Sequence, residues 1–152
     1  MSNIIEKIPN RMALAGGWID QPFVSRHNPG PPGSMVVVSL EPEFRFMDRC
    51  GMASSTRKVA SRLWGASLPD RDKAELVCEL YEEENRGLKD PSGSQDMIGL
   101  IYPGISRLDF DFAQNGGVFP VNIETCVDPV VARWFEKFIW VLPVAQRPEH
   151  YN

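Results

Sequence analysis

The sequence predicts an α+β domain, and three observations support this fold class. Segments with strand patterns lie mainly at the two ends and segments with helical spacing mainly between them, which differs from a regular strand–helix repeat. The length of 152 residues fits one domain. Apolar residues make up 43% and charged residues 24%, so a hydrophobic core can form without disulfide or metal support.

Strands are predicted where β-branched and aliphatic residues concentrate between turn residues. Pro9 divides the first such segment into a short strand before it and a strand over residues 12–15, after which Gly16 and Gly17 turn the chain. Residues 27–33 hold three prolines and two glycines and are expected to form a loop. The other predicted strands are residues 34–40, their hairpin partner 43–47, the antiparallel pair 107–112 and 118–123 joined across Asn115-Gly116-Gly117, and a buried strand over 138–144.

Helices are predicted from apolar residues at helical spacing and from signals at their ends. The predicted helices are residues 53–64, capped by Ser54 or Ser55, and residues 70–86, 95–102 and 129–137. The acidic run 82–84 is expected to be a solvated helix face. The four tryptophans, Trp18, Trp64, Trp134 and Trp140, are expected to pack in a core or an interface.

Composition disfavours several classes of function. The net charge is -4 and the pI is about 5.2, which gives no general attraction for nucleic acid. The cysteines Cys50, Cys78 and Cys126 are odd in number and lack Cys-x-x-Cys spacing, which argues against disulfides and structural zinc. His27 and His150 lie far apart in the sequence, which disfavours a histidine metal site.

The expected organisation is a domain over residues 1–145, followed by a polar tail over 146–152 that resembles the start of a linker to a missing C-terminal domain. The N-terminus lacks the pattern of a signal peptide, and no apolar run approaches the length of a membrane span. A cytoplasmic location without membrane partners is therefore expected.

The first segment that can carry chemistry runs from Arg11 to Asp20. Arg11 offers a planar cation that suits phosphate, and Asp20 can accept hydrogen bonds from sugar hydroxyls. Between them, Gly16 and Gly17 let the backbone approach a ligand closely. The alternative is an ordinary hairpin with a surface arginine and a turn aspartate.

The second segment leads through Gly51 into the predicted helix at Ser54, Ser55 and Thr56. Free backbone N–H groups and hydroxyls at a helix start can bind phosphate oxygens or a magnesium ion. The alternative is plain N-capping by serine.

The third segment, residues 91–96, delivers Asp96 to the start of a short apolar helix. A carboxylate at this position is stabilised by the helix dipole and can orient or deprotonate an attacking hydroxyl. The alternative is a helix cap followed by a core helix.

Together the three segments resemble the motifs of the GHMP small-molecule kinases, which include galactokinase, homoserine kinase and mevalonate kinase. The first family motif, P-G-R-x-x-L-x-G-E-H-x-D, matches residues 9–20 in register, with Gly17-Trp18 in place of Glu-His. The second, G-L-G-S-S-A, matches residues 51–56, with Ala53 in place of glycine. The loop G-W-Q-D-Q of the sugar-1-kinase branch, such as fucose kinase and heptose-phosphate kinase, matches residues 93–97.

The resemblance implies an N-terminal GHMP-kinase domain with a two-layer, ribosomal-protein-like fold, in which a mixed or antiparallel sheet packs on helices. It implies a nucleotide-binding transferase, a kinase that moves the γ-phosphate of ATP to a hydroxyl of a sugar or sugar phosphate. ATP and Mg²⁺ would be its cofactors. Such a domain would be incomplete without a C-terminal half.

The resemblance also implies roles for individual residues. Asp96 would be the catalytic carboxylate, and Arg11 would lower the pKa of the substrate hydroxyl or hold the transferring phosphoryl group. The sugar would be bound by Asp20, Gly16, Gly17 and Gln95. The phosphates of ATP would be bound by Gly51, Ser54, Ser55 and Thr56, with Ser55 also on Mg²⁺.

Two other functions are considered. Residues 21–50 leave a short distance between the first two motifs, and together with Ala53 this favours a non-catalytic domain that binds a sugar or metabolite. The aromatic residues favour an interaction or structural domain, such as a homodimer.

Overall fold

The computed structural model describes residues 8–27, 30–40, 54–140 and 142. In this part of the chain the strands are β1 (Asn10–Ala15), β2 (Gly33–Leu40), β3 (Ile105–Phe110) and β4 (Asn122–Cys126). The helices are α1 (Pro22–Ser25), α2 (Ser54–Trp64), α3 (Lys73–Glu84), α4 (Gln95–Ile101) and α5 (Pro129–Phe138), with a 3-10 turn, η2, at Asn115–Gly117.

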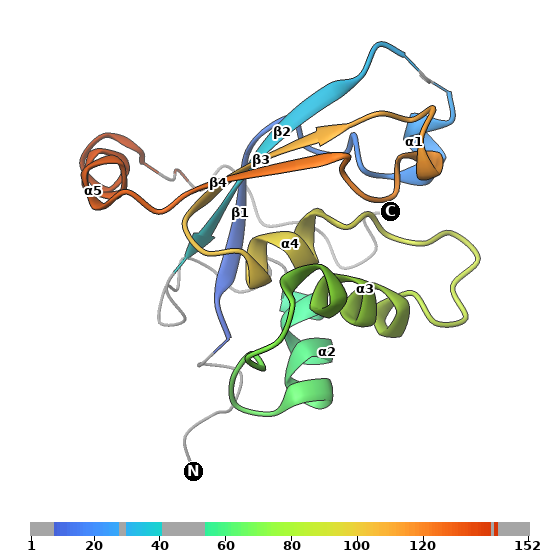
Figure 1. The fold of residues 1–152 in the computed structure, drawn as a ribbon, viewed down its shortest axis with the longest axis horizontal. Coiled ribbons are helices and arrows are strands. Elements are labelled where there is room, and N and C mark those ends of the chain that lie inside the picture. The colour runs from blue at the N-terminus through green and yellow to red at the C-terminus, as the bar shows by residue number, and fades with distance from the viewer. Residues whose placement is uncertain (1–7, 28–29, 41–53, 141, 143–152) are drawn as a thin grey trace.

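The strands form one antiparallel sheet in the order β1-β2-β3-β4. Figure 1 shows α2, α3 and α4 on one side of this sheet, while α5 lies beyond the end of β4. The α+β prediction is therefore confirmed. No helix in the described ranges combines the length and the apolar character that a membrane crossing requires.

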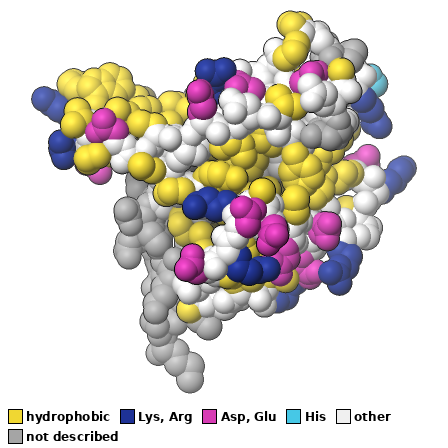
Figure 2. Space-filling view, viewed as in Figure 1, with side chains coloured by type: hydrophobic (Ala, Val, Ile, Leu, Met, Phe, Trp, Pro, Cys, Tyr) yellow, Lys and Arg dark blue, Asp and Glu magenta, His cyan; other side chains and the backbone are white. Residues whose placement is uncertain are grey.

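The core lies between the sheet and the helices. Side chains alternate between the two faces of a strand, and this alternation turns Met35 and Val37 of β2 and Leu108 and Phe110 of β3 toward the helices, where each is fully buried. Figure 2 shows hydrophobic side chains filling the space between the two layers. The helices contribute these buried side chains: Ala60 from α2, Leu76, Val77 and Leu80 from α3, and Met97, Ile98, Leu100 and Ile101 from α4.

Most predicted elements are confirmed with small shifts of their bounds. The predicted strand 34–40 is β2, and the predicted antiparallel pair is β3 and β4, connected through η2. The helix expected over 70–86 is shorter, because Asp72 caps α3 by accepting a hydrogen bond from the backbone N–H of Glu75 at 3.0 Å. The short helix α1 was not predicted. The strand expected over 43–47, and most of the one before Pro9, lie outside the described residues.

The buried strand predicted over residues 138–144 is wrong where the structure describes it. The helix α5 continues through Phe138, and Trp140 and Leu142 are 82% and 78% exposed outside any strand. The physical reason is that Val130, Trp134 and Phe138 recur every four residues, so the apolar run continues a helix capped by Asp128.

The expected packing of the tryptophans holds for Trp64, which is half-buried against the core. Trp18, Trp134 and Trp140 are exposed. Trp134 and Phe138 pack against each other with ring centroids 5.3 Å apart on the outer side of α5. Whether this surface binds another protein stays a prediction.

A polar cluster occupies the face of the sheet opposite the helices. The carboxylate of Asp109 accepts hydrogen bonds from Ser34 Oγ at 2.6 Å, from Arg107 at 2.9 and 3.0 Å, and from Asn122 at 3.1 Å. These donors, Ser34 first, lower the pKa of Asp109 to about 2. Because this pKa lies below the ordinary value of about 3.9, the cluster stabilises the fold above about pH 4, and that stabilisation is lost as the pH falls toward 2.

We predict that Ser34→Ala raises the pKa of Asp109 toward its ordinary value, because the substitution removes the donor that lies at the shortest distance from the carboxylate. Carbon-13 NMR titration of the Asp109 carboxyl group measures the shift. Ser39→Ala, on the same strand and outside the cluster, is the matched control and should leave the titration unchanged. An unaltered midpoint in Ser34→Ala would contradict this account.

Candidate functional site

The first and third sequence segments meet at an ion pair between Arg11 and Asp96. Arg11 lies on β1 and points toward the helices, and its guanidinium Nη2 donates to Asp96 Oδ1 in the first turn of α4. The Arg11 side chain is 9% exposed, whereas that of Asp96 is 27% exposed. The arginine is thus part of the interior, and the carboxylate remains partly accessible to a ligand.

Burial sets the electrostatics of this pair. It lowers the pKa of Arg11 to about 10, and the negative charge of Asp20 partly offsets that effect. Burial also raises the pKa of Asp20, although hydrogen bonds from Gln95 and the charge of Arg11 act in the opposite direction. The site therefore places one cation between two carboxylates, with Asp96 in direct contact.

Asp20 lies in the interior and contacts Gln95. Its side chain is fully buried, with Oδ2 accepting the backbone N–H of Gln95 at 2.9 Å and Oδ1 accepting Gln95 Nε2 at 3.0 Å. Gln95 is 6% exposed, and its Oε1 atom has no hydrogen-bond partner among the described residues. The structure thus brings together Arg11, Asp20, Gln95 and Asp96, as the motifs predict, but two of the expected sugar ligands are interior residues.

Two glycines make this arrangement possible. A Cβ atom at Gly99 would lie 2.1 Å from Arg11 Cγ, and one at Gly93 would lie 1.9 Å from Asp20 Oδ2. Asp96 and Gly99 are three residues apart on α4 and share a face of the helix, so the stem of Arg11 crosses Gly99 on its way to Asp96. Gly99 is not among the predicted site residues, although a glycine inside a predicted helix often indicates close packing.

The other predicted glycines lie at the turn after β1. Gly16 has φ +73°, and a Cβ there would lie 2.4 Å from the carbonyl oxygen of Ser34. Gly17 is exposed, with open space where a Cβ would stand. Gly16 is therefore required by the close approach of β2, whereas Gly17 is not constrained by packing.

The second segment lies at the start of α2 and contacts α3. Gly51 and the Ser54 side chain are outside the described part of the chain, and Ser55 is exposed. Thr56 is fully buried, and its hydroxyl donates to Glu84 Oε1 at 2.9 Å. The structure does not bring this segment into contact with Arg11 or Asp96 through any of the described interactions.

Glu84 is a further candidate site residue. The prediction that it belongs to a solvated helix face is wrong, because Glu84 is partly buried. Burial raises its pKa, and hydrogen bonds from Thr56 and Ser55 only partly offset this. Its Oε2 atom is buried and accepts no hydrogen bond from the described residues. Two hydroxyls and a carboxylate form an oxygen-only donor set, which suits Mg²⁺ when nucleotide phosphates supply further ligands. No group of three or more His, Cys, Asp or Glu residues lies together in the described ranges.

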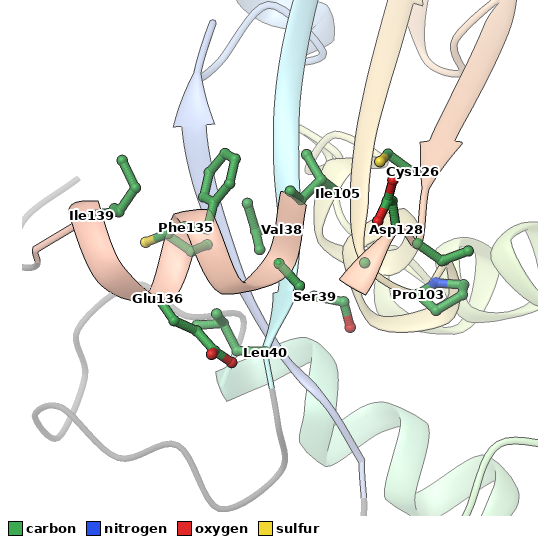
Figure 3. A pocket seen from close by; sticks show the side chains of 14 residues that line it. Val38, Ser39, Leu40, Pro103, Ile105, Cys126, Asp128, Phe135, Glu136 and Ile139 are labelled. Atoms are coloured by element: carbon green, nitrogen blue, oxygen red, sulfur yellow. The ribbon is translucent and has the colours of Figure 1, made fainter. Parts of the chain in front are cut away.

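A cavity of about 590 Å³ lies on the opposite face of the sheet, under α5 (Figure 3). Met12 lines it, whereas the neighbouring Arg11 points to the helix side. Phe135 and Ile139 of α5 lie on one side of the cavity, with Val38 from the sheet nearby. None of the predicted site residues lines this cavity, so it is separate from the Arg11–Asp96 site.

We predict that Gly99→Ala destabilises the fold by about 1–3 kcal/mol, the usual cost of overpacking a core. A loss of stability is informative, because alanine in a helix without such close packing is favoured over glycine by about 1 kcal/mol. Denaturant unfolding measures the change. Gly17→Ala is the control, because a Cβ at position 17 meets open space, and its free energy of unfolding should stay within about 0.5 kcal/mol of that of the native chain. A Gly99→Ala chain that is more stable than the native chain would refute the crossing of Arg11 over α4.

Comparison with known proteins gives no family assignment. The chain matches no protein-family model, no curated protein and no solved structure. The resemblance to the GHMP kinases therefore stays a prediction from the motifs, alongside the contacts that Arg11, Asp20, Gln95 and Asp96 make.

Proposed function

We propose that this chain is a GHMP-type carbohydrate kinase domain that moves the γ-phosphoryl group of ATP to a hydroxyl of a sugar or sugar phosphate. The observation that carries the proposal is the contact between Arg11 and Asp96, which are 85 positions apart in the sequence. The motif resemblance assigns these two residues to the same reaction. Their contact supports that assignment, because phosphoryl transfer to a hydroxyl needs a base and a cation at one point.

The proposed reaction needs a base and a cation at one point. The substrate hydroxyl oxygen forms a bond to the γ-phosphorus, the bond from that phosphorus to the β-phosphate bridging oxygen breaks, and ADP leaves. The hydroxyl proton passes to the carboxylate of Asp96, which is partly exposed. Arg11 orients that carboxylate, and its positive charge favours the transferring phosphoryl group.

The nucleotide side of the proposed site is the start of α2 with the end of α3. Ser55 and Glu84 would hold the magnesium ion of Mg·ATP, because Glu84 Oε2 is a buried acceptor without a partner among the described residues. When bound, the ion supplies charge neutralisation on the phosphates. The Thr56 hydroxyl keeps the Glu84 carboxylate in one orientation through its hydrogen bond to Oε1.

We predict that Asp96→Asn lowers kcat about 10²–10⁴-fold with ATP and the accepted sugar, because the amide cannot take the proton. Steady-state kinetics across a panel of monosaccharides and sugar phosphates measures the effect, and thermal melting verifies that the variant is folded. Asp90→Asn changes an exposed aspartate in the loop before α4 and serves as the control. Turnover that survives Asp96→Asn, or a native chain that phosphorylates none of the panel, would reject the kinase proposal.

We predict that Glu84→Gln raises the KM for Mg·ATP at least about tenfold, the loss typical of disturbed metal sites, while the KM for the sugar is unchanged. Glu82→Gln is the matched control, because Glu82 is exposed on the same helix. Titrating Mg²⁺ at fixed ATP separates a metal effect from a nucleotide effect. Equal Mg²⁺ dependence in both variants would exclude Glu84 as the ligand.

A further inference from the structure

The N-terminus of α4 is held in an unusual way. The N-cap residue is Ser94, but its side chain caps nothing on the helix and instead donates to the carbonyl oxygen of Val118 at 2.6 Å. The first N–H of the helix, that of Gln95, donates to Asp20 Oδ2 at 2.9 Å. A residue 75 positions earlier in the chain thus satisfies one of the four N–H groups that a helix start leaves without intrahelical partners, the task that an N-cap side chain performs at the second or third helical residue.

Among the described residues, the hydrogen bonds of the Asp20 carboxylate come from Gln95. The side chain is fully buried, and both carboxylate oxygens accept hydrogen bonds from Gln95. The backbone of Gly93 lies so close that a Cβ there would overlap Asp20 Oδ2. A sugar hydroxyl therefore has no path to the Asp20 carboxylate in this conformation.

The capped residue immediately precedes Asp96. The backbone of Gln95 is fixed by Asp20, and the Asp96 carboxylate is fixed by Arg11, whose stem crosses Gly99. Two independent contacts therefore determine where the partly exposed Asp96 carboxylate lies. Removing the cap frees the first turn of α4 even when the ion pair is present, because the helix start then loses its only acceptor among these contacts.

We propose that Asp20 is a positioning residue, which caps α4 in place of Ser94 and thereby holds Asp96 at the reacting hydroxyl. This inference rests on the proposed kinase function for its catalytic consequence, while the cap itself does not. It differs from a sugar-binding role for Asp20, which requires a direct contact with substrate. The two roles respond differently to substitution.

The substitution Asp20→Asn distinguishes the capping role of Asp20 from a sugar-binding role. An N-cap needs an acceptor oxygen, and asparagine supplies one about as well as aspartate. Its amide nitrogen can donate to Gln95 Oε1 once the Gln95 amide rotates by a half turn, because Gln95 Nε2 now faces this position and Oε1 lacks a partner among the described residues. Asp20→Asn should therefore restore what Asp20→Ala removes. A substrate contact made by the carboxylate would instead be weakened in both variants.

The first measurement is hydrogen exchange of the Gln95 amide by NMR, which needs no turnover. Asp20→Ala should speed it roughly tenfold, the size of a lost cap, and Asp20→Asn should stay within about threefold of the native chain. The control is Asp72→Ala, which removes the cap of α3 and should speed exchange at Glu75 but not at Gln95. Unchanged exchange at Gln95 in Asp20→Ala would overturn the cap.

The second measurement is kinetic. Asp20→Ala should lower kcat about tenfold with the KM values for sugar and ATP unchanged, and Asp20→Asn should recover most of kcat. A raised sugar KM in Asp20→Asn, with native exchange at Gln95, would overturn the positioning role in favour of substrate contact. If the native chain has no turnover, the kinase proposal fails, and the exchange data still decide whether Asp20 caps α4. If Asp20→Ala does not fold, the exchange rate of Gln95 and the sugar KM, both measured on Asp20→Asn, decide between the positioning role and the substrate contact.

Discussion

The buried guanidinium of Arg11 is the constraint on which this structure depends. A charge removed from water is costly unless partners compensate for it, and burial lowers the pKa of Arg11 to about 10. Asp96 provides direct contact and Asp20 provides a second negative charge nearby. Asp96 belongs to α4 and Asp20 accepts hydrogen bonds from Gln95 of α4, so compensation of the Arg11 charge ties this helix to β1.

The same constraint explains the small residues around the site. Close contact between an arginine stem and a helix requires a position without a side chain, which Gly99 provides, and Gly93 provides another for the Asp20 carboxylate. A larger side chain at Gly99 or Gly93 would displace the packed atoms and would also move the charged groups of the site apart. Fold stability and site geometry are therefore linked, and substitutions at these glycines are expected to affect both.

Much of the fold and part of the site could be predicted from the sequence. Periodicity predicted the helices and most strands because apolar residues recur at the spacing typical of each element, and the motifs assigned Arg11 and Asp96 to one site, where the structure brings them into contact. The burial of Asp20 could not be predicted, since spacing does not reveal which donors a carboxylate will meet. Glu84 was misassigned because an acidic run is ordinarily solvated, and residues 138–144 because a short apolar run suits a strand as well as a continuing helix.

The helix α3 connects the two sides of the proposed site. Tyr81 and Glu84 are three residues apart and share a helix face. Burial raises the pKa of Tyr81 and the charge of Asp20 adds to that shift, while Glu84 accepts a hydrogen bond from the hydroxyl of Thr56 on α2. Leu80, next to Tyr81 in the sequence, is fully buried in the core. The element proposed to hold the nucleotide's metal ion also packs directly against α4, so a shift of α3 would reach the first turn of α4 and Asp96 through that helix contact.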